Sequence, residues 1–393
     1  MIKLLTIIGA RPQIIKAAAI SRAIQSHFSD KIEEHILHTG QHYDQNMSAV
    51  FFDELGIPEP HYNLQVGSGT HATQTARITE GVEQVLLTAR EQGTPFDGVI
   101  VYGDTNSTLA ASIAAAKIHV PVFHIEAGLR SFNMTMPEEV NRIVCDQLST
   151  ILFTPTQTGL QNLHAEGFAE DGIKQRVRIA NGHGPRVVLS GDVMYDNSLY
   201  FSKIADNKCD IIERLELTNR GFVLATIHRP ANTDNSTNLQ SIFRALLDIA
   251  DSEQIDVVLP LHPRTRKMLS TQLTPSLLEQ IERCQRMKII DPASFFEIIR
   301  LEKNARVVMT DSGGVQKEAF FFETPCVILR PETEWVEIVE AGAGVIADAD
   351  YQRIIDGYHS LANKKIVFPP LFGDAHASEK ILEEIVFELN AKC

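Results

Sequence analysis

The sequence predicts an α/β protein made of two doubly wound, Rossmann-like domains that face a common cleft. Short apolar runs recur at intervals long enough for a helix, a pattern typical of parallel strands joined by helical crossovers. Nearly every run ends in a small polar cluster, and ligands of doubly wound folds bind beyond such strand ends. A chain of 393 residues also exceeds what one hydrophobic core usually supports, so two domains are expected.

The predicted strands fall into two groups. Five precede residue 192, at 4–8, 99–102, 122–125, 151–153 and 187–189. Five follow it, at 222–225, 257–259, 289–290, 307–309 and 327–329. We therefore expect a first domain over residues 1–192 and a second over 193–374. The segments 65–72 and 171–186 are expected to be loops. An apolar stripe after Gly373 predicts a C-terminal helix, 375–393, that returns to the first domain.

Composition narrows the function. With 36 basic and 50 acidic residues the net charge is −14, which argues against nucleic acid or an anionic membrane as the main partner. No apolar run approaches the length of a membrane span, so no membrane insertion is expected. The five cysteines form no CxxC pair and the 14 histidines show no metal-ligand spacing. These patterns predict a cytoplasmic protein without a metal site.

The stretch from Thr310 to Pro325 lies between two predicted parallel strands. Ser312, Gly313 and Gly314 stand where the connecting helix would begin, so free N–H groups at its positive end can receive an anion. Glu318 follows one turn later, where a carboxylate can accept hydrogen bonds from sugar hydroxyls. The pattern indicates a nucleotide site, with an ordinary helix cap followed by turn glycines as the alternative.

Three carboxylates follow predicted strands of the first domain: Asp104, Glu126 and Glu138. Taken singly, Asp104 could cap a helix, Glu126 could close a strand, and Glu138 could be an acid in the first turn of a helix. Together with basic residues elsewhere they suggest a site that handles protons and phosphates; these residues are Arg11, Lys16, Arg142 and His228. The segment Gly342–Ala347 fits G-x-G-x-x-A, but it follows a helical segment and leads into an apolar run, so no dinucleotide cofactor is expected.

Several motifs occur together in a specific order: Gly9-Ala10-Arg11-Pro12, Gly103-Asp104-Thr105, His124-Ile125-Glu126-Ala127-Gly128-Leu129-Arg130, Pro137-Glu138-Glu139-Val140-Asn141-Arg142, His228-Arg229, His262-Pro263 and Asp311-Ser312-Gly313-Gly314 through Glu318. On these motifs the whole chain resembles the non-hydrolysing UDP-N-acetylglucosamine 2-epimerase family. That family shares the two-domain fold of GT-B glycosyltransferases.

The resemblance implies a UDP-sugar substrate, no cofactor and a homodimer. Asp104, Glu126 and Glu138 would act at the sugar, and Glu318 would hold the ribose. The diphosphate would be held by Arg11, His228, Ser312, Gly313 and Gly314. His228 would also be a catalytic residue, together with the three carboxylates. Lys16, Arg142 and Arg330 match family positions near the substrate.

The reaction expected for such a site is elimination. Carbon 2 of a sugar nucleotide has no neighbouring carbonyl to stabilise a carbanion, so a carboxylate would take its proton while UDP leaves carbon 1. UDP would then add back to the resulting glycal. A GT-B glycosyltransferase, a hydrolysing 2-epimerase and a nucleotide-sugar-binding module remain alternatives.

Departures from the common family pattern point to a subgroup. Gln13 stands where Glu is common, Trp335-Val336 where Arg-Pro is common, and the segment 41–47 also differs. With the neighbouring motifs, these residues resemble the subgroup that epimerises UDP-2,3-diacetamido-2,3-dideoxy-glucuronate. Gln13 would either face the sugar, where it removes a repulsion against the substrate carboxylate, or be an exposed helix residue without consequence.

Overall fold

The computed structural model of the chain describes residues 1–40, 56–168 and 185–391. The unusual segment 41–47 and most of the expected loop 171–186 lie outside these residues. The chain divides into two compact units, one formed by Met1–Asn197 with Pro370–Cys393 and the other by Ser198–Pro369. The division falls after Asn197, inside a continuous helix, whereas the sequence placed it after Asp192.

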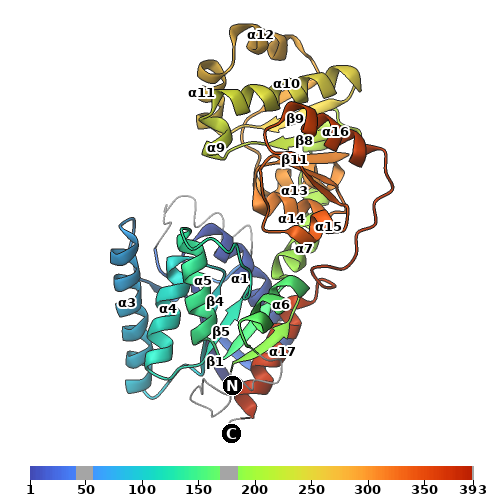
Figure 1. Cartoon of the computed structure of the whole chain (residues 1–393). Helices are drawn as coiled ribbons and strands as arrows, with labels where there is room; N and C mark the ends of the chain where they lie inside the picture. The colour runs from blue at the N-terminus through green and yellow to red at the C-terminus, as the bar shows by residue number, and fades with distance from the viewer. Residues whose placement is uncertain (41–55, 169–184, 392–393) are drawn as a thin grey trace. The chain divides into compact units, whose positions relative to one another are not determined.

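The first unit is built on a parallel sheet that includes β1, β4 and β5 (Figure 1). The seven strands of this sheet have the order β3-β2-β1-β4-β5-β6-β7. Its strands are β1 (Ile2–Ile8), β2 (Ile32–His38), β3 (Tyr62–Asn63), β4 (Gly98–Tyr102), β5 (Val122–Ile125), β6 (Ile151–Thr154) and β7 (Arg186–Leu189). Its helices are α1 (Arg11–Ala23), the π-helical turn η1 (Ile24–Phe28), α3 (His71–Glu91), α4 (Asn106–Lys117), α5 (Pro137–Leu148), α6 (Gln157–Ala165) and α17 (Ala377–Asn390). Helix α7 (Val193–Lys208) runs from this unit into the next.

The second unit is a parallel sheet whose six strands have the order β10-β9-β8-β11-β12-β13. Its strands are β8 (Phe222–Thr226), β9 (Asp256–Pro260), β10 (Met287–Ile290), β11 (Val307–Thr310), β12 (Cys326–Ile328) and β13 (Gly344–Ile346). Its helices are α8 (Ile211–Arg214), α9 (Pro230–Thr233), α10 (Ser236–Ser252), α11 (Pro263–Gln272), α12 (Pro275–Arg283), α13 (Phe295–Asn304), α14 (Gly313–Phe321), α15 (Val336–Glu340) and α16 (Tyr351–Ala362).

Both faces of the second sheet are buried, which explains why its strands are continuously apolar. Val223 and Val307 pack with α10 and α16 in one cluster. Their neighbours Leu224 and Val308 face the opposite way and pack with α8, α13 and α14 in another cluster. Alternate residues of one strand therefore serve two cores, and the predicted α/β fold with two doubly wound sheets is confirmed.

Three strands escaped the sequence prediction. The strand β2 contains Glu33, Glu34 and His35 in its middle, which interrupt the apolar pattern. The strand β3 has two residues, and β13 begins at a glycine. The expected loop 65–72 ends at Thr70 instead, because the Thr70 hydroxyl caps α3, which begins at His71.

Helix α17 belongs to the first unit and packs against α1. The carboxylate of Asp196 accepts hydrogen bonds from the backbone N–H groups of Ala377 and Ser378 at its first turn. Farther along the helix, Arg186 forms an ion pair with Glu384 at 2.6 Å. These contacts fix the start and the middle of the helix to residues that are distant in sequence.

Each sheet has one topological switch point, where strand order reverses and ligands of doubly wound folds bind. In the first sheet it lies between β1 and β4, which are followed by Arg11 and Asp104. In the second sheet it lies between β8 and β11, which are followed by His228 and Ser312. These four sequence-predicted site residues therefore lie beside the positions where this architecture places ligands.

Candidate active site

In the first unit, Lys16 and Glu126 form the centre of a charged cluster. Lys16 Nζ lies 2.6 Å from Glu126 Oε1, and both side chains are largely buried. Gly103 permits this arrangement, because a Cβ there would lie 3.2 Å from Lys16 Nζ and 3.4 Å from Glu126 Oε1. Its backbone also has φ +61°, a conformation that favours glycine.

Glu126 itself follows β5 in an unusual backbone conformation. Its φ of +70° is the left-handed region, which costs a residue other than glycine about 1–3 kcal/mol. In this conformation the Glu126 carboxylate contacts Lys16. Such strain concentrates at functional sites, so it supports a chemical role for Glu126 beyond closing the strand.

Asp104 joins the same cluster from the end of β4. Its carboxylate pairs with Arg142, and its backbone oxygen accepts a hydrogen bond from Asn141 Nδ2 at 2.9 Å. Burial raises the pKa of Asp104, and although Arg142 counteracts this effect, Glu126 and Glu138 add to it. Asp104 does not cap α4, because the cap is the hydroxyl of Thr105. The helix-cap alternative for Asp104 is therefore wrong.

Glu138 and Glu139 begin α5 and have different surroundings. Glu138 is exposed in the first turn, close enough to Asp104 to affect its pKa. Glu139 is buried, pairs with Arg142 at 2.7 Å and accepts hydrogen bonds from the backbone N–H of Ser131. Sequence reasoning missed Glu139, although its spacing of three residues from Arg142 is typical of a helical ion pair.

Gln13 contradicts both alternatives that the sequence left open. Its side chain is 1% exposed, so it is not a surface residue. Its amide nitrogen lies 2.9 Å from Thr105 Oγ1 and 3.0 Å from both the Tyr102 carbonyl oxygen and Thr108 Oγ1. Its amide oxygen accepts from the backbone N–H of Ala10. Gln13 thus joins α1 to the start of α4, and it is not placed to face a sugar.

In the second unit, Asp311 organises the turn after β8. This buried carboxylate accepts hydrogen bonds from the backbone N–H groups of His228 and Arg229 and lies 3.0 Å from His228 Nδ1. Burial acts to raise the pKa of Asp311, but the contacts with His228, Arg229 and Asn232 outweigh burial and lower it. The side chain of His228 remains more than half exposed and is available to a ligand.

Ser312, Gly313 and Gly314 form the start of α14, as the sequence predicts. The Ser312 hydroxyl accepts from the backbone N–H of Val315, and Gly314 is exposed. A Cβ on Gly313 would lie 3.3 Å from Glu334 Oε2 and 3.6 Å from Arg330 Nη1. The glycines therefore leave a helix N-terminus with an arginine nearby, an arrangement suited to an anion.

Arg330 is buried and already has an acidic partner. Its guanidinium forms two hydrogen bonds to Glu334, at 2.8 and 2.9 Å. Burial acts to raise the pKa of Glu334, but Arg330 outweighs it and the pKa is lowered. Sequence reasoning did not name Glu334 as a site residue, and its spacing from Arg330 gave no signal, because both residues lie in the loop between β12 and α15 and not on a helix.

Trp335, one of the departures from the common family pattern, is buried beside the start of α14. It is 7% exposed, and its indole N–H donates to the Gly313 carbonyl oxygen at 3.0 Å. Lys317 Nζ lies 4.4 Å from the centre of its ring, a cation–π geometry. Trp335 therefore contacts α14 at Gly313 and Lys317 and is buried against it.

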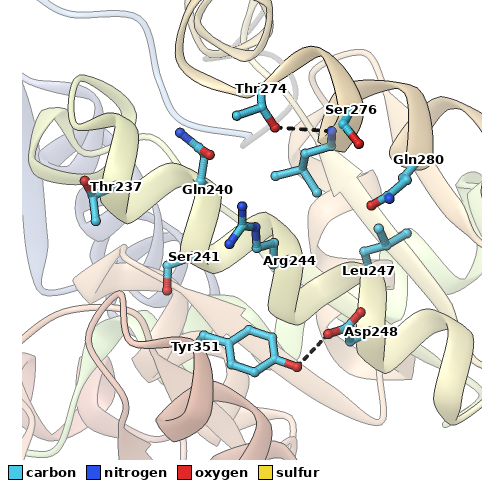
Figure 2. Close-up of a pocket in the computed structure, with 11 residues that line it drawn as sticks. Thr237, Gln240, Ser241, Arg244, Leu247, Asp248, Thr274, Ser276, Gln280 and Tyr351 are labelled. Atoms are coloured by element: carbon cyan, nitrogen blue, oxygen red, sulfur yellow. Dashed lines mark hydrogen bonds between the residues drawn. The ribbon is translucent and has the colours of Figure 1, made fainter.

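A groove of about 780 Å³ lies on α10, α12 and the first residue of α16, away from these residues. Figure 2 shows the hydroxyl of Tyr351 directed to Asp248 and the cap formed by Thr274 at the start of α12. None of the sequence-predicted site residues lines this groove. It lacks paired carboxyl groups and a glycine-rich helix start, so its lining does not fit the site that the sequence predicts.

The profile of the UDP-N-acetylglucosamine 2-epimerase family matches residues 24–386. The chain belongs to this family. A UDP-2,3-diacetamido-2,3-dideoxy-D-glucuronate 2-epimerase of Pseudomonas aeruginosa is 45% identical over 97% of this chain and 98% of its own. The crystal structure of Methanocaldococcus jannaschii UDP-GlcNAc 2-epimerase in complex with UDP-GlcNAc and UDP is 36% identical, with a TM-score of 0.79 over 98% of this chain and 100% of that chain.

The fold extends beyond the epimerases. Phytolacca americana UGT2, complexed with UDP-2fluoro-glucose and pterostilbene, has a TM-score of 0.64 over 99% of this chain and 100% of that chain, at 10% identity. At this identity the likeness concerns the fold alone, which is GT-B-like. The 2-epimerase family, whose members are isomerases, is instead shown by sequence.

The structure brings the predicted site residues together in two groups. One group, in the first unit, is the cluster of Asp104, Glu126, Lys16 and Arg142, with Glu138 beside it. Arg11 begins α1 at the same switch point. The other group surrounds the start of α14 and contains His228, Ser312, Gly313 and Arg330. Glu318 lies one turn further along this helix. Within the described residues no helix is both long and apolar enough to span a membrane, and no three acidic, histidine or cysteine side chains are grouped as metal ligands.

Proposed function

We propose that this 2-epimerase interconverts UDP-2,3-diacetamido-2,3-dideoxy-glucuronate and its manno epimer, for surface polysaccharide synthesis. The observation that carries the proposal is the partly buried cluster of Asp104 and Glu126 with Lys16 and Arg142, because it offers paired acid and base groups. The choice of sugar is supported by the 45% identity to the Pseudomonas aeruginosa enzyme.

The chemistry begins with loss of UDP. A carboxylate takes the proton from carbon 2, the C–H electron pair forms the double bond between carbons 1 and 2, and the bond from carbon 1 to the phosphate oxygen breaks. In the second half, a carboxyl group returns a proton to the opposite face of carbon 2 as the β-phosphate oxygen of UDP attacks carbon 1. The sum is an epimer with no other product.

Glu126 and Asp104 have different environments, which suits a division into one acid and one base. Glu126 is held by the ammonium group of Lys16 at 2.6 Å. Burial raises the pKa of Asp104 despite its contact with Arg142. Paired carboxyl groups in different surroundings are a common means of supplying an acid and a base at one pH. Glu138 is the third carboxyl group of this proposal.

The second unit would bind the departing diphosphate. The N–H groups at the start of α14 and the exposed ring of His228, fixed through Nδ1 to Asp311, would stabilise the negative charge that grows as UDP leaves. Arg11 and Arg330 would add positive charge. Glu318 would accept hydrogen bonds from the ribose hydroxyls.

Incubation with the UDP-sugar alone in deuterium oxide tests the proposal. We expect the 2-epimer to form without an acceptor, with deuterium at carbon 2 and no net release of UDP. Turnover only with an acceptor would indicate a glycosyltransferase, and stoichiometric UDP release a hydrolysing epimerase. Binding without turnover would indicate a binding module, and an epimer without deuterium would exclude exchange with solvent at carbon 2.

The choice between sugars requires a separate comparison. UDP-2,3-diacetamido-2,3-dideoxy-glucuronate and UDP-N-acetylglucosamine should be offered separately and their kcat/KM values compared, because this ratio measures discrimination directly. A higher kcat/KM for UDP-N-acetylglucosamine would overturn the proposed substrate but not the reaction. The proposal also includes a cytoplasmic homodimer, for which light scattering and cell fractionation are the tests.

A further inference from the structure

His124, on β5, is completely buried between two hydrogen-bond acceptors. Its Nε2 lies 2.8 Å from the backbone oxygen of Gly103, and its Nδ1 lies 2.7 Å from Asp146 Oδ1. A carbonyl oxygen can only accept a hydrogen bond, so Nε2 must carry a proton. The proton between Nδ1 and Asp146 belongs either to the ring or to the carboxyl group, and the surroundings of Asp146 decide which.

Asp146, on α5, is also 0% exposed, and its second oxygen accepts from two further donors. Arg130 Nη2 lies 2.6 Å and the backbone nitrogen of Gly128 lies 3.3 Å from Asp146 Oδ2. Burial acts to raise the pKa of Asp146, but its contacts with His124 and Arg130 outweigh burial and lower it. An ionised Asp146 leaves the proton on Nδ1, so His124 is a doubly protonated, positively charged ring.

The charges around this ring are balanced. Arg130 forms two more hydrogen bonds, of 2.6 and 2.9 Å, to Glu166 at the end of α6. Positive and negative side chains therefore alternate from Glu166 to His124, as buried charges require. Among the described residues, Cys145 also acts on the ring from α5. Burial acts to lower the pKa of His124, but Cys145 and Asp146 outweigh burial and raise it.

Gly103, which accepts the proton from Nε2, connects two carboxylates of the active site. Its own N–H donates to the Ile125 carbonyl oxygen at 2.9 Å, so both polar groups of its backbone bind β5. These two bonds hold Gly103 in its left-handed conformation, with φ +61°. Asp104 follows Gly103 directly, and Glu126 follows Ile125. The contacts of one glycine therefore set the backbone positions from which both carboxylates extend.

We propose that His124 is a positioning residue, whose charged ring holds the Gly103 carbonyl and thereby fixes Asp104. The inference deepens the proposed function and rests on it, because Asp104 and Glu126 are its proposed acid and base. Charge-assisted hydrogen bonds are about twice as strong as neutral ones, so a charged ring holds the turn more firmly than a neutral ring. Proton transfer at carbon 2 tolerates little displacement, since a misplacement of about 1 Å can cost about a hundredfold in rate.

Nitrogen-15 NMR of the protein labelled at histidine tests the charge of the ring. We expect both ring nitrogens of His124 to stay protonated from about pH 6 to 9, on both sides of the usual histidine pKa of 6.5. The loss of its signals in His124→Phe assigns them. A bare ring nitrogen in the wild-type protein at about pH 7 would overturn the inference.

Asp146→Asn is the variant matched to this measurement. The new amide N–H can donate to Nδ1, while the amide oxygen keeps the contacts with Arg130 and Gly128. Every hydrogen bond of the network is then retained, but the ring of His124 becomes neutral. We therefore expect its spectrum to show one bare nitrogen, and kcat to fall about tenfold because the bond to Gly103 is weaker.

Variants of the ring itself separate positioning from packing. His124→Phe keeps a ring without a donor and should lower kcat about a hundredfold, while UDP affinity stays within about twofold. His124→Gln restores one neutral donor within reach of Gly103 and should recover about tenfold of that loss. The control is Phe123→Leu, since Phe123 is the preceding residue of β5 and is also 0% exposed. It should lower the melting temperature but keep kcat within about twofold.

Kinetics are to be measured well below each melting temperature. Wild-type kcat in His124→Phe, an equal fall in Phe123→Leu, or wild-type kcat in Asp146→Asn with a neutral ring would each overturn the inference. If His124→Phe does not fold, wild-type kcat in His124→Gln has the same meaning. Asp104→Asn separates the inference from the proposed function. Full activity in Asp104→Asn would remove the proposed role of Asp104, whereas loss there with full activity in His124→Phe would remove the positioning role alone.

Discussion

At the scale of single residues, the sequence predicted which residues gather near one another better than it predicted the direction in which each side chain points. The sequence placed Lys16, Glu126, Asp104 and Arg142 near one another because each is close to a strand end or a helix start. It could not show that Gln13 faces inward, because a polar residue in a first helical turn is usually exposed. The left-handed backbone of Glu126 was equally hidden, since no glycine marks it.

The first prediction concerns Gln13. Replacement by alanine should destabilise the protein by about 1–3 kcal/mol, because it removes the hydrogen bonds from Gln13 to Thr105 and Thr108 and leaves the buried backbone N–H of Ala10 without its acceptor. Chemical unfolding would measure this loss, with the exposed Gln25→Ala as control. Gln13→Glu should leave the ratio of kcat/KM for the two UDP-sugars unchanged. A shift towards UDP-N-acetylglucosamine greater than about tenfold would restore a sugar-facing role.

At the scale of helices and strands, apolar runs were sufficient to find the central strands. The strands β4, β5, β6 and β8, β9, β11 are buried on both faces and therefore stand out in sequence. The missed strands have mixed or minimal patterns: β2 has the consecutive polar residues Glu33, Glu34 and His35 in its middle, and β13 takes a glycine into the sheet. The start of α14 was predictable because Ser-Gly-Gly combines a cap with an open backbone.

The second prediction tests the turn that Asp311 holds after β8. Because its native pKa lies below the ordinary 3.8, its stabilising effect is present above that value and is lost as pH falls through the native pKa. Asp311→Asn should lower the melting temperature at pH 7 by several degrees, since charge-assisted hydrogen bonds contribute about 1.5–3 kcal/mol each. The two melting curves should converge below about pH 3.8.

The control for that experiment is Asp291→Asn, because the Asp291 side chain is 93% exposed. This variant should follow the wild-type curve throughout. If Asp311→Asn melts like wild type at pH 7, the turn is held by other contacts. If it loses stability equally at every pH, the effect comes from shape and not from the charge of Asp311.

At the scale of the whole molecule, the chemistry-bearing residues are divided between two independently packed sheets. The carboxyl groups proposed to move protons all belong to the first unit, and the residues proposed to hold most of UDP belong to the second. The sequence predicted this division because both groups of motifs follow strands of separate sheets. It could not predict that α7 would run through the boundary, because a continuous helix has no composition shift to mark the division.

This division predicts two distinct kinetic phenotypes. Asp104→Asn, in the first unit, should lower kcat about a hundredfold or more, the range for loss of a general acid or base, while UDP affinity stays within about twofold. Glu318→Ala, in the second unit, should weaken UDP binding by about one to two powers of ten, because it removes charge-assisted hydrogen bonds to the ribose. Its kcat at saturating substrate should change much less, since these bonds are made before and during the reaction alike.

Calorimetry with UDP and steady-state kinetics on the same preparations would separate the two effects, with melting temperatures showing that both variants are folded. If Asp104→Asn unfolds or keeps full activity, Asp104 is structural. If Glu318→Ala lowers kcat as much as Asp104→Asn does while its UDP affinity is unchanged, Glu318 acts on the transition state and not on the bound nucleotide. The double variant would then show whether Asp104 and Glu318 act independently. Additive losses in the free energy of transition-state binding are expected for residues that act separately, because non-additivity requires that they share one interaction.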